Sequence, residues 1–111
     1  MKKLEFQFAF GATGVSLSQK IGSHGIVMGY VVKEPSFSAA ITGGFTITDK
    51  NSIAMKTVTG LAKATTHIYG KGLTNDIDMR LPIAPDDVLT ATISAAAEGT
   101  GGTVIIILLL A

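Results

Sequence analysis

The feature that most constrains the fold is an alternation of apolar and polar side chains. It recurs in residues 4–10, 45–48, 77–83 and 89–95. Side chains along a strand point alternately to two faces, so a period of two predicts β-strands. Clusters of Gly, Pro, Asn and Asp separate these segments about every ten residues, as turns do in all-β proteins. No segment predicts a helix of useful length, so we predict an all-β protein of about eight short strands.

Strands at this spacing are typical of a sandwich or a barrel. We predict an antiparallel two-sheet sandwich, and the strand number favours a jelly roll. An immunoglobulin-like sandwich is the alternative, although the chain has neither Trp nor Cys. With 111 residues, 47% of them hydrophobic, the chain can build one core but not two. We therefore predict a single β-sandwich domain over residues 1–111.

The carboxyl-terminal segment, residues 104–110, consists of seven consecutive apolar residues. A membrane-spanning helix needs about twenty, so the run predicts a strand that is covered on both faces. A sandwich covers only one face of a strand, and an exposed apolar strand promotes aggregation. One row of alternating side chains should therefore fill the core, and the other should meet a neighbouring chain. A covering segment of the same chain, residues 39–40 or the segment at Leu61, is the alternative. The row that we take as the candidate interface is Val104, Ile106, Leu108 and Leu110.

The charge content agrees with association. Charged residues make up 15% of the chain, against a usual quarter, and such a surface protects a monomer poorly from self-association. We predict a homo-oligomer, either a trimer or another closed form. A net charge of +1 gives no basic footprint for nucleic acid. Glu5 and Gln7 interrupt the apolar start of the chain, so we expect no signal peptide and no membrane partner.

Residues that could carry chemistry are few. His24 lies in a glycine-rich turn, and His67 lies in a strand on the same face as Tyr69, with no acid–base partner at a readable spacing. The glycine-rich residues 99–102 precede a strand, whereas a phosphate-binding loop must open a helix, so they predict a hairpin turn. Cysteine is absent, which excludes thiolate chemistry. We predict no enzyme activity and no cofactor.

The acidic residues form one cluster in the sequence. Calcium needs six to eight oxygen ligands, often supplied by loop carboxylates. The spacing here does not match an EF-hand loop, and turns and ion pairs with Arg80 or Lys71 explain the residues equally well. We therefore predict no metal site at the cluster, which comprises Asp76, Asp78, Asp86 and Asp87.

Two stretches resemble a known group of proteins. Residues 81–94, LPIAPDDVLTATIS, are followed by a glycine-rich turn and an apolar last strand. Residues 45–49, FTITD, precede a hairpin and then Gly60-Leu61 with a threonine-rich continuation. Together, over residues 45–110, these resemble the small sandwich proteins of tailed-phage virions.

That resemblance implies a structural virion protein, a capsid cement or decoration protein that binds the major capsid protein as a trimer or a larger ring. It implies a location on the capsid surface after synthesis in the host cytoplasm. The group has no catalytic motif, so no functional residue is carried over. A neck or tail appendage, or a receptor- or carbohydrate-binding module, is the alternative. Only 6% of the residues are aromatic, which counts against a sugar site.

Overall fold

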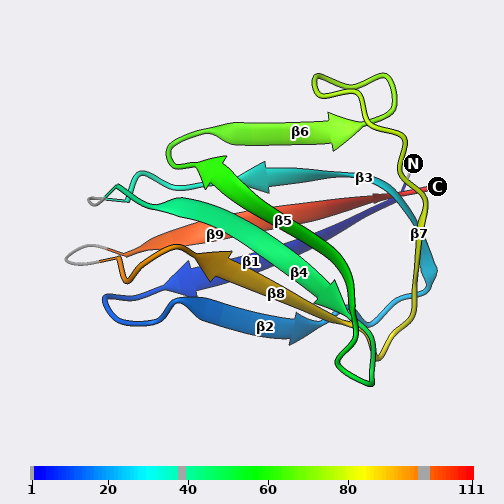
Figure 1. Cartoon of the computed structure of the whole chain (residues 1–111). Coiled ribbons are helices and arrows are strands. Elements are labelled where there is room, and N and C mark those ends of the chain that lie inside the picture. Colours follow the sequence, from blue (N-terminus) through cyan, green and yellow to red (C-terminus); the bar gives the residue numbers. More distant parts are fainter. Residues whose placement is uncertain (1, 38–39, 98–100) are drawn as a thin grey trace.

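The computed structural model describes residues 2–37, 40–97 and 101–111 (Figure 1). Within these residues it contains nine strands and no helix, so no helix there could cross a membrane. The strands are β1 (Lys2–Phe10), β2 (Ser16–Lys20), β3 (Gly25–Lys33), β4 (Thr42–Thr48), β5 (Ala54–Ala62), β6 (Thr66–Gly70), β7 (Leu81–Ile83), β8 (Val88–Ile93) and β9 (Gly102–Leu110).

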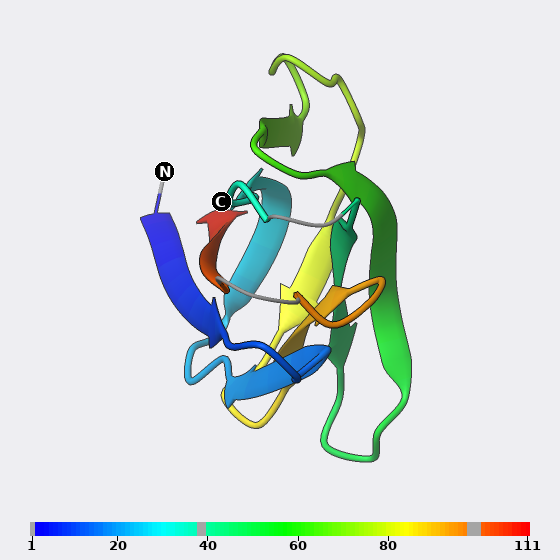
Figure 2. The same cartoon turned by 90° about the vertical axis from the view of Figure 1, so that its left-hand side faces the viewer.

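The strands form two antiparallel sheets, which confirms the predicted two-sheet sandwich. Sheet A has the order β1-β9-β3-β6, and β7 also pairs with β3. Sheet B has the order β2-β8-β4-β5. In Figure 2, β1, β9 and β3 form one wall of the molecule, and β8, β4 and β5 form the other.

The alternation predicts the positions of most strands, and residues 77–80 are an exception. Residues 77–80 alternate like a strand, yet only Leu81–Ile83 pairs, with β3. The predicted strand over 77–83 is therefore wrong in its first half. Met79 lies in that irregular segment, and its side chain is buried in the core. Of the predicted turn at residues 99–102, residues 99 and 100 lie outside the described residues.

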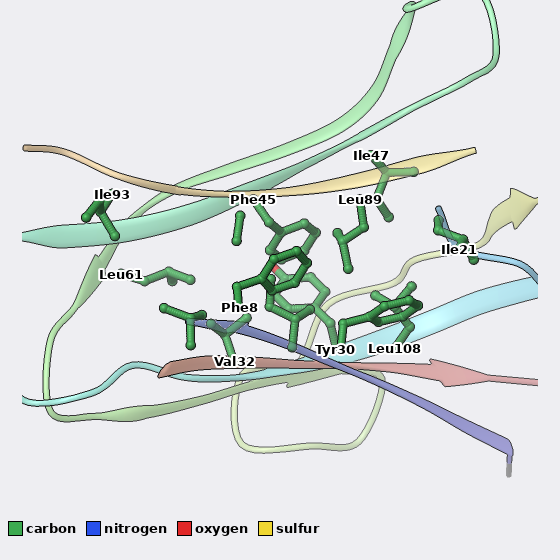
Figure 3. Packing of buried hydrophobic residues seen from close by; sticks show 14 of the residues in the cluster. Phe8, Ile21, Tyr30, Val32, Phe45, Ile47, Leu61, Leu89, Ile93 and Leu108 are labelled. Carbon is green, nitrogen blue, oxygen red and sulfur yellow. The ribbon is translucent and has the colours of Figure 1, made fainter. Parts of the chain in front are cut away.

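The core lies between the two sheets and is built from the inward rows of both. In Figure 3, Phe45 and Leu89 of sheet B point toward Phe8, Tyr30 and Leu108 of sheet A. The rings of Tyr30 and Phe45 meet edge to face, with their centres 5.0 Å apart. This contact joins the two sheets through aromatic surface, which contributes most per residue to a core.

Two edges of the sandwich have local features that limit further strand pairing. At the β1 and β2 edge, the side chain of Gln19 donates to the carbonyl oxygen of Gln7 over 2.7 Å. At the β5 edge, the pairing with β4 shifts register between Gly43 and Phe45, and Gly60 adopts φ +74°. A glycine with positive φ at a register shift is the usual form of a β-bulge, and bulges blunt exposed edges.

Candidate interaction surface

The predicted interface row lies in the core of the single chain. Val104, Ile106, Leu108 and Leu110 are each at most 1% exposed. The pairing of β1 with β9 explains this, because Phe6 lies opposite Ile106 and residues directly opposite share a face. A partner could reach this row only if the sandwich opened. The outward row of β9 is Ile105, Ile107 and Leu109, of which Ile105 and Ile107 are partly exposed.

The outward row of β9 is the centre of an apolar surface on sheet A. Val31 of β3 lies opposite Ile107, and Ile68 of β6 lies opposite Val31, so both share the outward face. We call the following residues the outer apolar stripe: Val31, Ile68, Ile105, Ile107 and Leu109. All are half-buried except Leu109, which is 6% exposed.

A segment of the same chain covers one end of this stripe. Gly29 lies opposite both Leu109 and Gly70, and a Cδ atom of Leu73 lies 2.8 Å from where a Cβ of Gly70 would stand. The loop between β6 and β7 therefore provides a cover at the Gly70 end of the row that contains Leu109. The segment at Leu61 does not supply it, because that side chain is 3% exposed and belongs to the core. Of the other predicted cover, residues 39–40, residue 39 lies outside the described residues.

Charged groups flank the stripe on both sides. Lys3 and Glu5 lie on β1, opposite Leu109 and Ile107, and Lys33 lies on β3, opposite Ile105. All three side chains are exposed. Among the described residues, the one ion pair is between Lys20 and Asp86, so these three pair with no other described residue. They are free to meet charges on another molecule.

The outward face of sheet B has a different chemistry. One row crosses all four strands through Ser18, Thr90, Thr46 and Thr57, each opposite the next. The hydroxyl oxygens of Ser18 and Thr90 are 2.7 Å apart, and those of Thr46 and Thr57 are 3.4 Å apart. We call the following residues the hydroxyl face: Ser16, Ser18, Thr46, Thr48, Thr57, Thr90 and Thr92.

The two histidines lie apart and pair with no carboxylate in the described part of the chain. His67 is half-buried, and its Nε2 atom is 2.9 Å from the carbonyl oxygen of Ala62. His24 is exposed at the opposite end of the sandwich, in the turn before β3. The structure does not bring them into one site.

Two of the four aspartates of the acidic cluster accept hydrogen bonds within their own turns. Asp76 accepts from the amide of Gly72 over 3.0 Å, and Asp87 accepts from the amide of Ala84 over 2.7 Å. Asp86 lies 3.9 Å from the Lys20 amine, with both side chains exposed. No group of three or more His, Cys, Asp or Glu residues suited to a metal ion occurs among the described residues.

Three turns at one end of the sandwich enclose an open pocket of about 460 Å³. Asp49 lines it but uses one carboxylate oxygen to accept from the amides of Asn51 and Ile53, over 2.8 and 3.0 Å. That geometry is an Asx turn, which fixes the β4–β5 connection. The remaining lining residues are His24, Lys50, Asn51, Ala84, Pro85, Asp86 and Asp87.

Sequence reasoning missed one unusual group, the carboxylate of Glu34. The side chain is 5% exposed, and neither oxygen has a hydrogen-bond partner among the described residues. It packs against Gly43 of β4, in space that any larger side chain there would fill. Burial raises the pKa of Glu34 to about 7, because the charged form is poorly solvated there. A charged residue before Pro35 has the pattern of an exposed strand end, so the sequence held no signal for this burial.

We found no match for this chain among family models, curated proteins or solved structures.

Proposed function

We propose that this chain is a structural virion protein of the capsid cement or decoration type, which acts by adhesion. It associates with copies of itself and binds the phage capsid shell, which it stabilises by burying surface between subunits. The observation that carries the proposal is the outer apolar stripe, a band of Ile, Val and Leu on the outward side of a sheet. Contiguous apolar patches on the outside of a soluble protein often mark contact surfaces.

The size of the face supports repeated weak contacts. Strands lie about 4.8 Å apart and rise about 3.4 Å per residue, so four strands of up to nine residues give on the order of 500 Å² of flat face. A standard protein interface buries about 800 Å² on each partner. One face alone would therefore bind modestly, and an oligomer on a repetitive shell would gain avidity from simultaneous contacts.

We also propose that the sandwich is a jelly roll. The order β1-β9-β3-β6 in one sheet and β2-β8-β4-β5 in the other supports this topology. Strands close in sequence are divided between the sheets, and the last strand returns to lie beside the first. Jelly rolls are common in viral capsid and lectin domains, which supports a virion role by analogy of fold alone.

The resemblance to virion proteins is the basis for the partner and the location. We propose the major capsid protein as partner and the capsid surface as location, after synthesis in the host cytoplasm. A neck or tail appendage, or a receptor- or carbohydrate-binding module, is favoured by the polar pocket around Asp49 and Asn51. That pocket has no aromatic lining residue among those described, and sugar rings usually stack on one. If the gene for this chain lies beside a major capsid gene, its position would support a capsid cement protein. A position among tail genes would support a neck or tail appendage.

The adhesive surface is tested with one matched pair of substitutions. Ile107 of β9 and Thr90 of β8 both point outward from a strand that has neighbours on both sides. Ile107→Asp should leave the circular dichroism spectrum unchanged and reduce the particle mass measured by light scattering. Thr90→Asp should keep the wild-type mass. A wild-type protein that is a stable monomer at micromolar concentration, or an Ile107→Asp variant of unchanged mass, would overturn the proposal.

A further inference from the structure

Two opposite charges lie on the two sides of the outer apolar stripe. Glu5 belongs to β1 and lies in the same cross-strand row as Ile107, whereas Lys33 belongs to β3 and lies in the row of Ile105. The two strands are separated by β9, so the Cα atoms of Glu5 and Lys33 are about 10 Å apart across the sheet and about 7 Å apart along it. Among the described residues, the side chain of Glu5 has one hydrogen-bond partner. This is the side-chain amide of Gln7, which donates to Glu5 over 3.2 Å.

A two-fold axis in the plane of the face can exchange these two positions. It passes midway between Glu5 and Lys33, above the gap between Ile105 and Ile107. When a second copy is placed by this axis, each Glu5 lies over Lys33 of the other copy. The spacing of rows and strands also brings Ile107 over Val31 of the second copy. A self-complementary face of this kind forms the isologous interface of a closed dimer.

We infer that sheet A pairs face to face with sheet A of a second copy, about a two-fold axis at Ile105 and Ile107, with two symmetric Glu5–Lys33 ion pairs. The inference rests on the proposed self-association and names its partner and geometry. It gives a dimer as the basic unit, where the resemblance to virion proteins implies a trimer. The apolar stripe supplies the affinity, and the ion pairs fix the orientation, as charges at the rim of an interface do.

The third charged group on this face does not oppose the arrangement. Lys3 lies one row beyond Glu5, at the outer edge of the sheet, opposite Leu109. Its long side chain can keep its amine in water while its stem lies along apolar surface. Lys33 is therefore the cation that the two-fold axis places against Glu5.

The test is a charge-exchange cycle. Dissociation constants would be measured by sedimentation velocity for the wild type, Glu5→Lys, Lys33→Glu and the double variant. Each single reversal places two like-charge pairs in the interface and should weaken dimerisation about tenfold or more at low salt. The double variant should restore wild-type affinity, because it exchanges the charges and keeps the pairs. Lys50→Glu, at an exposed turn residue, makes the same change in net charge as Lys33→Glu and should have no effect.

The outcomes separate this inference from the proposed function. Unchanged affinity in both single reversals, no restoration in the double variant, or a trimeric wild type overturns the two-fold pairing. If Ile107→Asp still dissociates the protein in those cases, self-association through sheet A stands. If the wild type is monomeric, both fall together.

Discussion

The outward faces of the two sheets differ although their inward faces are alike. Both sheets bury apolar rows in one core, yet sheet A turns Ile105, Ile107 and Val31 outward, and sheet B turns Thr46 and Thr90 outward. Ile, Val and Thr are all β-branched and all favour strands, so the two faces satisfy the backbone equally. The outward face of sheet B is largely polar, although Val88 lies on it opposite Thr48. Under the proposed self-association, contact with a second copy explains the outer apolar stripe of sheet A.

The largest expected effect contrasts the two rows of one strand. Ile106 is 0% exposed, so Ile106→Asp places an unpaired charge in the core. The cost is several kcal/mol, comparable with the roughly 5–15 kcal/mol that stabilises a domain. Circular dichroism should show Ile106→Asp unfolded, whereas Ile107→Asp, on the half-buried row, should be folded and dissociated. If both variants unfold, the outward row of β9 is needed for folding, and the difference between the two outward faces does not support association.

A smaller effect concerns the core between the faces, at Glu34. The folded pKa of about 7 lies above the ordinary value of 4.5, so the folded state holds its proton longer than the unfolded state does. Stability is therefore fully present below about pH 4.5 and falls as the pH rises through 7. The loss is about 3 kcal/mol, from about 1.4 kcal/mol per pKa unit.

Urea unfolding of Glu34→Gln between pH 4.5 and 8 checks this expectation. The amide cannot ionise, so the variant should lack the fall in unfolding free energy that the wild type shows. Asp78→Asn removes an exposed carboxylate outside the proposed interface and serves as the control, because it should keep the wild-type slope. A wild-type stability that does not decline between pH 4.5 and 8 would show that Glu34 is ionised and compensated in the folded protein.

The sequence predicts the sandwich because alternation is a local signal. It does not predict which row of residues 104–110 faces inward, because both rows are apolar and carry no polar marker. The answer depends on the register with β1, where Phe6 lies opposite Ile106 and Glu5 opposite Ile107. The register between the two ends of the chain cannot be predicted from either segment alone.

The burial of Glu34 was unpredictable for a related reason. Its environment is set by Gly43 on β4, a strand of the other sheet that reaches it only in three dimensions. Candidate sites built from neighbours in sequence fare no better. The aspartates of the acidic cluster are close in sequence, but their carboxylates bond to separate turns, one at Gly72 and one at Ala84.

The smallest expected effect is on the hydroxyl face, with Thr46→Val and Thr90→Val combined. Valine keeps the β-branched shape and removes the hydroxyls that contact Thr57 and Ser18 on the solvent side. Exposed hydrogen bonds of this kind contribute little net stability. The free energy of unfolding, measured by thermal denaturation, should therefore change by no more than about 0.5 kcal/mol. The particle mass should also stay the same, because two valines among hydroxyls do not make a continuous apolar band flanked by charges. Increased association of this variant in light scattering would mean that apolar character alone drives adhesion, and that the charges beside the stripe on sheet A are not needed.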